Sequence, residues 1–429
     1  MRSLLTKLLF TLTRRILERY QPLVVGITGS VGKTTAKEAL AHILSVAGKQ
    51  ARKSTGSFNT EIGVPLTVIG VDRSPGKSVM GWLTVLSRGV QLLAGDRAHY
   101  PAVLVLEMGA DRPGDIEQLV RLTKPAVGML TAVGPAHLER FGDLEGIIRE
   151  KKKIVTLLPK TSCAIIPSDE PVLHTLKKEV RARVLTVGAT EGSDVRVSDV
   201  RFICDPQSLP TSGTYCKLGW QGSSVPCFLP GVLGLAAARS AGFAAAAAFA
   251  MDVGALTVSE ALRTWMPPPG RMRIIPGIKD TVLIDDSYNS SPKAAAAALE
   301  AVSDLGWRGR RYVVFGDMAE LGKTTREEHE RLGALIAEHK PDCFVAVGPT
   351  MVEAVRAARA SGMEESSVFH FADTQSAGLF VQERLHPGDL VLIKGSQVMR
   401  MERIVKELMA EPLKASELLV RQGEDWKNK

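Results

Sequence analysis

An apolar strand, a glycine-rich turn and a helix follow one another near the start of the chain, and this unit constrains the fold more than any other segment. Residues 23–27 are apolar, and a helical pattern follows over residues 33–47. The turn reads Gly-Ile-Thr-Gly-Ser-Val-Gly-Lys-Thr-Thr over residues 26–35. A strand that leads through such a turn into a helix opens a βα unit, which predicts a parallel sheet flanked by helices.

The turn has the residue types of a phosphate-binding loop. Glycines let backbone N–H groups approach a triphosphate closely, and the helix N-terminus adds a positive dipole. Lys33 is expected to reach the β- and γ-phosphates, and the Thr34 hydroxyl to bind Mg²⁺. The spacing departs from the usual pattern, because Ile27 stands where the first glycine is expected. The residues predicted to bind the phosphates are Gly29, Ser30, Gly32, Lys33, Thr34 and Thr35.

Polar residues follow two further apolar strands, which we expect at residues 102–106 and 127–133. Glu107 ends the first strand, and His137 lies just beyond the second. The carboxyl ends of parallel strands meet at one edge of a sheet, where ligands gather. Either residue alone fits a structural role, but beside a phosphate loop the pair predicts a metal site.

The composition narrows the class of protein. A length of 429 residues predicts two or three domains, and 45% hydrophobic with 23% charged residues excludes a disordered or fibrous chain. The net charge of +8 fits anionic ligands or an acidic membrane surface. No long basic run is present, so nucleic-acid binding is not expected. Five scattered cysteines without C-x-x-C spacing indicate a reducing compartment and argue against zinc.

The pattern of elements predicts an α/β fold. We expect a central phosphate-loop ATPase-like domain with a parallel sheet, followed by a Rossmann-like C-terminal α/β domain. Three prolines and a glycine at 267–270 mark the boundary. The expected units are a basic amphipathic helix over 1–20, the ATP-binding domain over 21–266, the C-terminal domain over 267–410 and a polar tail, as a frayed helix, over 411–429.

Inside these domains, two segments stand out from the alternating pattern. Residues 184–229 alternate short β-branched runs with turn residues, which predicts a small antiparallel extension. Residues 235–254 are rich in alanine, which predicts a closely packed, buried helix. The strands of the C-terminal domain are expected at 281–284, 311–315, 343–347, 368–371 and 390–393.

Two helical segments could face a membrane. Residues 1–20 combine Lys7, Arg14, Arg15 and Arg19 with apolar residues, and residues 79–95 form a second apolar stretch. The first is too short and too charged to span a bilayer, and it lacks a signal-peptide cleavage site. Packing against the body is the simpler interpretation for both segments. Peripheral membrane contact is the alternative.

Eight motifs lie in order along the chain, at residues 27–38, 57–67, 106–115, 134–139, 268–272, 285–292, 315–322 and 394–403. They resemble those of the Mur ligases, the ATP-dependent amide ligases of cell-wall precursor synthesis. They resemble one branch of that family closely, the ligases that add D-alanyl-D-alanine to a muramoyl-tripeptide. The matches keep their order from Val24 to Leu408.

The resemblance implies a reaction and its cofactors. ATP phosphorylates a carboxylate of the wall precursor to an acyl phosphate, and the amine of an amino acid or dipeptide displaces the phosphate. Two Mg²⁺ ions assist, the first at Thr34 and the second at Glu107 and His137. Lys151 matches the lysine that the family carbamylates with CO₂ to make a metal ligand, although Lys152 and Lys153 are adjacent.

The resemblance also assigns residues to substrates. It places Lys33, Lys151, His137 and Glu107 in the catalytic centre. Arg271 is expected to bind the nucleotide phosphates and Asp286 the ribose. The residues that it places near the two substrates are Asn59, Asn289 and Asp317. We also expect a cytoplasmic monomer that has no nucleic-acid partner, with peripheral contact to the inner face of the membrane through the N-terminal helix as the alternative.

Two departures from the family leave the substrate open. Only the basic helix precedes the phosphate loop, where the family carries a UDP-binding domain. Leu233, Gly234 and Ala237 stand at positions where the family has residues that contribute to adenine recognition. A Mur-like ligase for another substrate and a non-catalytic ATP-binding scaffold are therefore the alternatives. A switch GTPase is disfavoured by the lack of a clear Asn-Lys-x-Asp motif.

Overall fold

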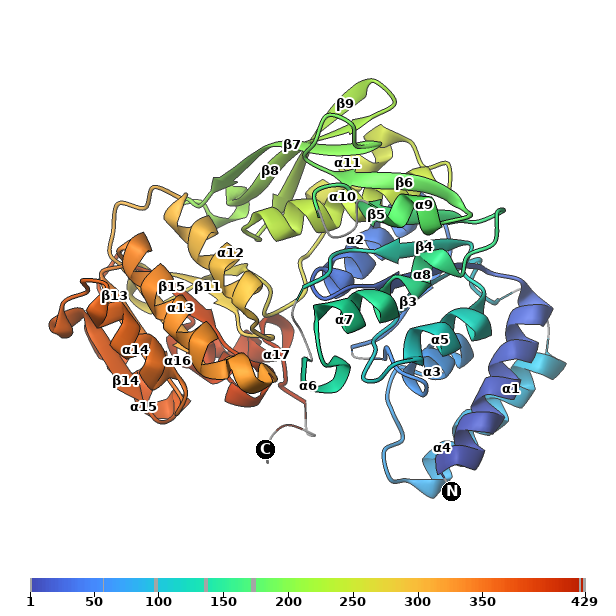
Figure 1. The fold of residues 1–429 in the computed structure, drawn as a ribbon, viewed down its shortest axis with the longest axis horizontal. Helices are drawn as coiled ribbons and strands as arrows, with labels where there is room; N and C mark the ends of the chain where they lie inside the picture. Colours follow the sequence, from blue (N-terminus) through green and yellow to red (C-terminus); the bar gives the residue numbers. More distant parts are fainter. Residues whose placement is uncertain are drawn as a thin grey trace.

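Two sheets, each with helices on both faces, make up the protein (Figure 1). The computed structural model describes residues 2–56, 58–95, 99–134, 138–170, 175–423 and 426; the side chains of 2, 3, 138 and 139 are outside this description. Buried residues form one core on each side of the first sheet, and one of these cores extends over a face of the second sheet. A third core covers the other face of the second sheet. The predicted α/β class, with a large parallel sheet and a second sheet, is confirmed.

The first sheet has nine strands, of which the phosphate-loop strand is near the centre of the parallel part. All neighbours are parallel from β2 to β7, and β7, β8 and β9 are antiparallel. The spatial order is β2 (Ala51–Lys53), β3 (Val103–Glu107), β1 (Leu23–Thr28), β4 (Val127–Leu130), β5 (Cys163–Pro167), β6 (Arg183–Gly188), β7 (Val195–Ile203), β8 (Gly213–Trp220), β9 (Ser223–Pro230).

Helices cover both faces of this sheet, since side chains of β1 alternate between the two cores. Val25 and Ile27 point to one core and Val24 to the other. The helices are α1 (Arg2–Tyr20), α2 (Lys33–Val46), α3 (Gly63–Ile69), α4 (Val79–Ala94), α5 (Asp115–Thr123), α6 (Leu138–Phe141), α7 (Leu144–Lys151), α8 (Lys153–Thr156), α9 (Leu176–Glu179), α10 (Leu235–Phe249) and α11 (Ala255–Thr264).

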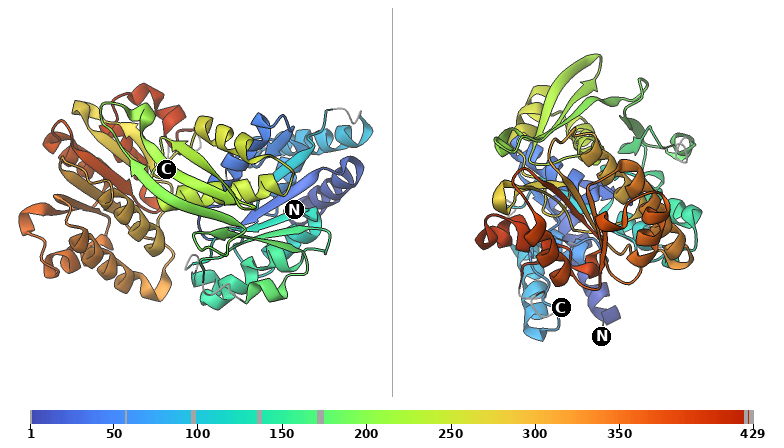
Figure 2. Two further views of the ribbon diagram at one scale, coloured as in Figure 1. Left: turned by 90° about the horizontal axis from the view of Figure 1, so that it is seen from above. Right: turned by 90° about the vertical axis from the view of Figure 1, so that its left-hand side faces the viewer.

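The second sheet has six strands and is parallel except for its first strand. Their order is β10 (Arg273–Pro276), β11 (Val282–Asp286), β15 (Leu390–Lys394), β12 (Arg311–Gly316), β13 (Cys343–Val347), β14 (Val368–Phe371). Its helices are α12 (Pro292–Ser303), α13 (Thr325–His339), α14 (Met351–Ala360), α15 (Thr374–Arg384), α16 (Glu402–Leu408) and α17 (Ala415–Leu418). The two sheets lie side by side along the long axis of the molecule (Figure 2).

The alanine-rich helix α10 is buried, as its composition predicts. Twelve of its 15 residues are buried. Gly242 shows why small residues are needed, because a Cβ there would lie 2.6 Å from the Val197 side chain. The helix packs on α2 and beneath β7, so it supports the phosphate-loop helix from behind.

Four features differ from the sequence prediction. Strand β4 ends at Leu130, because the next residues turn over the phosphate loop and bond to it. The segment 184–229 is antiparallel only from β7, while β6 extends the parallel sheet. The antiparallel edge strand β10 has no predicted counterpart. From its sequence the tail is expected to be a polar, frayed helix, but its residues Ala415 and Leu419 are buried in the third core.

Helix α4 also differs from its simpler interpretation as a buried helix. Only Val85 and Gly89 are buried along its length. It packs beside α1 and α3 through one face, and its other face is exposed. In the described ranges, no helix combines the length and the hydropathy that a bilayer-spanning segment needs.

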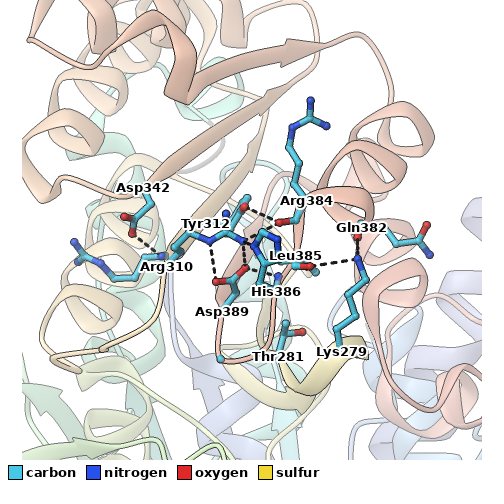
Figure 3. A network of polar contacts seen from close by, with 12 residues as sticks. Lys279, Thr281, Arg310, Tyr312, Asp342, Gln382, Arg384, Leu385, His386 and Asp389 are labelled. Carbon is cyan, nitrogen blue, oxygen red and sulfur yellow. Dashed lines mark hydrogen bonds and ion pairs between the residues drawn. The ribbon is translucent and has the colours of Figure 1, made fainter.

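A polar network closes the amino-terminal edge of the second sheet (Figure 3). Arg310 donates from Nε and Nη2 to Asp389, at 3.1 and 2.6 Å, which joins the loops that enter β12 and β15. Lys279 donates to the carbonyl of Gln382 at 2.8 Å. Ligands of parallel sheets bind at the opposite, carboxyl edge. We therefore assign this network to stability and not to the site.

Candidate active site between the two domains

The phosphate loop is held in shape by the segment that follows β4. The Ser30 amide donates to the Ala132 carbonyl at 2.8 Å, and Ser30 Oγ donates to the Gly134 carbonyl at 2.9 Å. A Cβ on Gly29 would lie 2.1 Å from Thr131 Oγ1, so only glycine fits there. The loop is thus preformed at the N-terminus of α2.

Lys33, Thr34 and Glu107 meet at the carboxyl ends of β1 and β3. Thr34 Oγ1 donates to Glu107 Oε2 at 3.0 Å, and Lys33 Nζ donates to the Gly29 carbonyl at 2.8 Å. Burial lowers the pKa of Lys33, although the charge of Glu107 opposes this. Three of the residues predicted from the sequence, Lys33, Thr34 and Glu107, therefore lie close together.

Glu107 is kept ionised by its cationic surroundings. Burial alone would raise its pKa, but the charges of Lys33, Lys37 and Arg271 outweigh burial and lower it. Lys37 Nζ lies 3.6 Å from Glu107 Oε2 and donates to the Ser54 carbonyl at 2.8 Å. An ionised, buried carboxylate beside a threonine hydroxyl supplies the oxygen ligands that Mg²⁺ prefers.

Lys37 is a residue that the sequence reasoning missed. Its side chain is fully buried, and it follows Lys33 by four residues on the same helix. That spacing puts both amines on one face of α2, which was the signal available in the sequence. We infer its role from its position. Lys37 lies beside the Glu107 carboxylate, which also accepts a hydrogen bond from Thr34 and is stabilised by the charge of Lys33.

Lys151 reaches the phosphate loop from the end of α7. Its Nζ donates to the Gly29 carbonyl at 3.1 Å, and only 4% of the residue is exposed. Burial and the nearby charge of Lys33 lower the pKa of Lys151 to about 7. Lys152 instead donates a hydrogen bond to Glu179, and Lys153 donates one to Glu150. Of the three adjacent lysines, Lys151 is the one beside the predicted site.

The C-terminal domain contributes an arginine to the phosphate loop. Arg271 Nη2 donates to Thr34 Oγ1 at 3.2 Å, and its guanidinium stacks over the Tyr288 ring at 4.1 Å. The Arg271 Nε is buried and has no hydrogen-bond partner among the described residues. A buried unpaired donor beside the loop fits an anionic ligand.

Asp286 ends β11 and lines a cleft between the two domains. Lys394 Nζ donates to Asp286 Oδ2 at 2.6 Å and to the Asn289 carbonyl at 2.9 Å. Burial raises the pKa of Asp286, and the Lys394 ammonium opposes the rise. Lys394 was also missed, although it ends β15 at the edge where the other site residues lie. Its position past an apolar strand was the available signal.

The remaining predicted residues have different outcomes. Asn59 Nδ2 donates to Glu107 Oε1 at 3.5 Å, and Asn289 lines the cleft. Asp317 does not point into it, because its Oδ1 accepts from the amides of Thr350 and Met351 at the start of α14. His137 lies outside the described residues, so its predicted role stays a prediction.

A cleft of about 740 Å³ lies between the domains. The phosphate loop forms one wall, and Arg271, Asp286 and Asn289 lie on the other side. Leu233, Gly234 and Ala237 line the cleft as well. Its volume lies within the range of small-molecule and cofactor sites. Residues from both domains therefore surround one space with a phosphate loop at its end.

Two family models match the chain. The model described as Mur ligase middle domain matches residues 84–223, and the model described as Mur ligase, glutamate ligase domain matches residues 270–397. The first range contains Glu107 and Lys151, and the second contains Arg271, Asp286 and Lys394. The residues that line the cleft or contact the phosphate loop beside it thus come from both matched domains.

Named relatives agree with these models. The chain is 29% identical over 404 residues to UDP-N-acetylmuramoyl-tripeptide–D-alanyl-D-alanine ligase of Bacillus subtilis, with 94% of this chain and 79% of the relative covered. The Escherichia coli enzyme of that name is 29% identical over 394 residues, with 90% and 76% covered. The crystal structure of MurF ligase from Thermotoga maritima in complex with ADP gives a TM-score of 0.76 at 26% identity, with 94% and 83% covered. The chain therefore belongs to the Mur ligase superfamily of ATP-dependent ligases.

Proposed function

We propose that this protein joins D-alanyl-D-alanine to the tripeptide carboxylate of a muramoyl precursor, with ATP as the energy source. The observation that carries the proposal is the meeting of Lys33, Thr34, Glu107 and Lys151 with Arg271 from the other domain. The substrate classes come from the names of the relatives, which are D-alanyl-D-alanine ligases. A carboxylate oxygen attacks the γ-phosphorus and displaces ADP. The amine then attacks the acyl carbon, loses a proton and displaces phosphate.

Cations are the main requirement of this reaction, because it brings phosphate and carboxylate oxygens together. Lys33 and Arg271 supply two positive charges at the phosphate loop. The buried unpaired Nε of Arg271 is available to a phosphate oxygen. The two domains must be close for both cations to act, which makes domain closure part of the assembly of the site.

The oxygen atoms of Thr34 and Glu107 fit Mg²⁺. They lie 3.0 Å apart at the phosphate loop, and Glu107 is ionised. Bound Mg²⁺ neutralises phosphate oxygens and orients the γ-phosphoryl group. We assign a first ion to Thr34 and a second to Glu107, His137 and a carbamate on Lys151.

The carbamate on Lys151 is supported by the state of its amine. A pKa of about 7 leaves much of the amine neutral near neutral pH, and a neutral amine is the form that adds to CO₂. Lys33 disfavours an ammonium at this position. The same charge favours the carbamate anion, so carbamylation turns an unfavourable pair of cations into a favourable pair of opposite charges.

The nucleotide base requires contacts unlike those of the family pattern. Leu233, Gly234 and Ala237 offer apolar or backbone groups to the cleft. We assign Asp286 to the ribose hydroxyls and Asn59 and Asn289 to the substrates. Asp317 acts on the amine substrate only through the loop that it holds, because its carboxylate caps α14.

Phosphate release from ATP tests the function. The assay contains Mg²⁺, bicarbonate, UDP-muramoyl-tripeptide and D-alanyl-D-alanine, each omitted in turn, and a second series uses the lipid-linked acceptor. Release should need both substrates and should be lost in Lys33→Ala and kept in Lys160→Ala, a control at an exposed lysine. A protein that binds ATP but releases no phosphate with either acceptor would favour another substrate or a scaffold.

We also propose a cellular compartment, an oligomeric state and a membrane contact for the enzyme. The five free cysteines fit a reducing cytoplasm. We propose a monomer that works beside the inner face of the membrane, with α1 as its contact. The partly exposed apolar side of α1, with Leu4 and Leu8, supports this contact.

A further inference from the structure

Helices α1 and α4 project together from the first domain. Their carboxyl ends are joined, since Arg19 Nη2 donates to the Gly95 carbonyl and Tyr20 Oη to the Leu92 carbonyl, both at 2.6 Å. The two helices therefore run in the same direction. Their amino-terminal ends lie together at an outer edge of the molecule (Figures 1 and 2).

The projecting ends expose apolar side chains. We define the two-helix tip as Leu4, Leu8, Val79, Met80 and Leu83, which are 64%, 45%, 70%, 72% and 53% exposed. Val90 is also exposed and continues the apolar face along α4. Exposed apolar side chains that gather at the ends of two neighbouring helices are typical of an interaction surface in a folded protein.

Positive charge gathers on the same two helices and on the loop before α4. Residues 2–20 contain five basic residues and one acidic residue, and residues 71–95 contain three basic residues and one acidic residue. These two segments therefore carry +6 of the net +8 of the chain. The charge is scattered in the sequence, but the fold brings it to one pair of helices. The exposed basic residues are Lys7, Arg14, Arg15, Arg73, Lys77 and Arg88.

We propose that the two-helix tip docks the protein on a membrane surface that contains anionic lipids. The apolar side chains would enter the boundary between headgroups and acyl chains, while lysine and arginine side chains contact lipid phosphates. A second copy of the tip is a poorer occupant, because it would bring two positively charged surfaces together. The inference rests on the membrane contact proposed above for α1, and it adds α4 and the lipid class.

Vesicle co-sedimentation tests this surface without any ligase substrate. The probes are vesicles of phosphatidylcholine alone and of phosphatidylcholine mixed with phosphatidylglycerol. The protein should bind the mixed vesicles, and added salt should weaken the binding. The double variant Met80→Ser with Leu83→Ser should bind roughly tenfold or more weakly, because it removes two apolar anchors. Lys77→Glu should also bind more weakly.

A matched control uses exposed apolar residues far from the tip. Leu256→Ser with Leu413→Ser changes side chains that are 73% and 97% exposed and should bind as the unmodified protein does. Absence of binding, equal binding to both vesicle types, or equal loss in the tip and control variants would overturn the proposal. So would a dimer in solution that the tip variant dissociates.

Ligase activity is measured separately in the same variants. Phosphate release with soluble substrates should be unchanged by substitutions at the tip, because these side chains are exposed and remote from the cleft. Vesicle binding without phosphate release would count against the proposed reaction alone. Phosphate release without vesicle binding would count against the docking surface alone.

Discussion

Replacing Lys151 by methionine should abolish ligation and yet stabilise the fold at neutral and acidic pH. The pKa of Lys151 is lowered by burial and by Lys33 to about 7, from 10.5 for a free lysine. One pKa unit corresponds to about 1.4 kcal/mol. Keeping this amine protonated in the folded protein therefore costs about 5 kcal/mol, as an upper estimate. Methionine has a similar length and no charge, so it removes this cost.

The effect has a defined pH window. Between pH 7 and 10.5, the unfolded chain binds a proton at Lys151 that the folded protein does not bind. The free energy of unfolding of the unmodified protein therefore rises with pH through this window, and the full cost is present below it. The advantage of Lys151→Met should be greatest near pH 6 and should shrink towards pH 10.

Urea unfolding of both proteins in CO₂-free buffer measures this difference across the window. Lys152→Met is the matched control, because Lys152 pairs with Glu179 at the surface. Bicarbonate near pH 8 should then stabilise the unmodified protein and not Lys151→Met, since the folded amine is mostly neutral there and can form a carbamate, while the amine of the unfolded chain stays protonated. Stability curves of the two proteins that stay parallel from acidic to alkaline pH would refute the reasoning.

Three other substitutions test the site. Lys37→Met should lower kcat/KM by roughly 10- to 100-fold in steady-state assays, because Glu107 loses a buried cation, and an unchanged value would reject that role. Arg271→Ala should lower kcat/KM for ATP by roughly tenfold or more, through loss of charged hydrogen bonds; calorimetric ATP binding equal to that of the unmodified protein would contradict this. Gly29→Ala should cost about 1–3 kcal/mol in thermal unfolding, because its Cβ would overlap the Thr131 hydroxyl, and an unchanged melting temperature would disprove the close approach.

Local patterns were sufficient for much of the site. The strand, glycine turn and helix around Lys33 are defined by short-range spacing, and Glu107 is marked by its place after an apolar strand. Parallel strands carry such residues to the same edge of the sheet. The meeting of Lys33, Thr34 and Glu107 could therefore be predicted from the chain alone.

Other assignments needed the packed structure. A lysine after an apolar run looks the same whether it is solvated or buried, so the choice of Lys151 over its neighbours depends on which side chain reaches Gly29. Asp317 lies in a motif that suggests the site, but the neighbouring helix α14 takes its carboxylate. Such competition between partners is decided by distance in three dimensions.

The exposed faces of α1 and α4 show most clearly which features depend on the sequence alone and which depend on the tertiary structure. The pattern of apolar residues in the sequence predicts that α1 and α4 are helices, and the charge and short apolar run of α1 predict that it does not span a bilayer. The sequence does not say which faces are covered, because burial depends on what packs alongside. Only the tertiary structure joins Arg19 to Gly95 and leaves Val79 and Met80 exposed. Long-range packing thus assembles one surface from two segments that are separated in the chain by about 60 residues, which form β1, α2, β2, α3 and their loops.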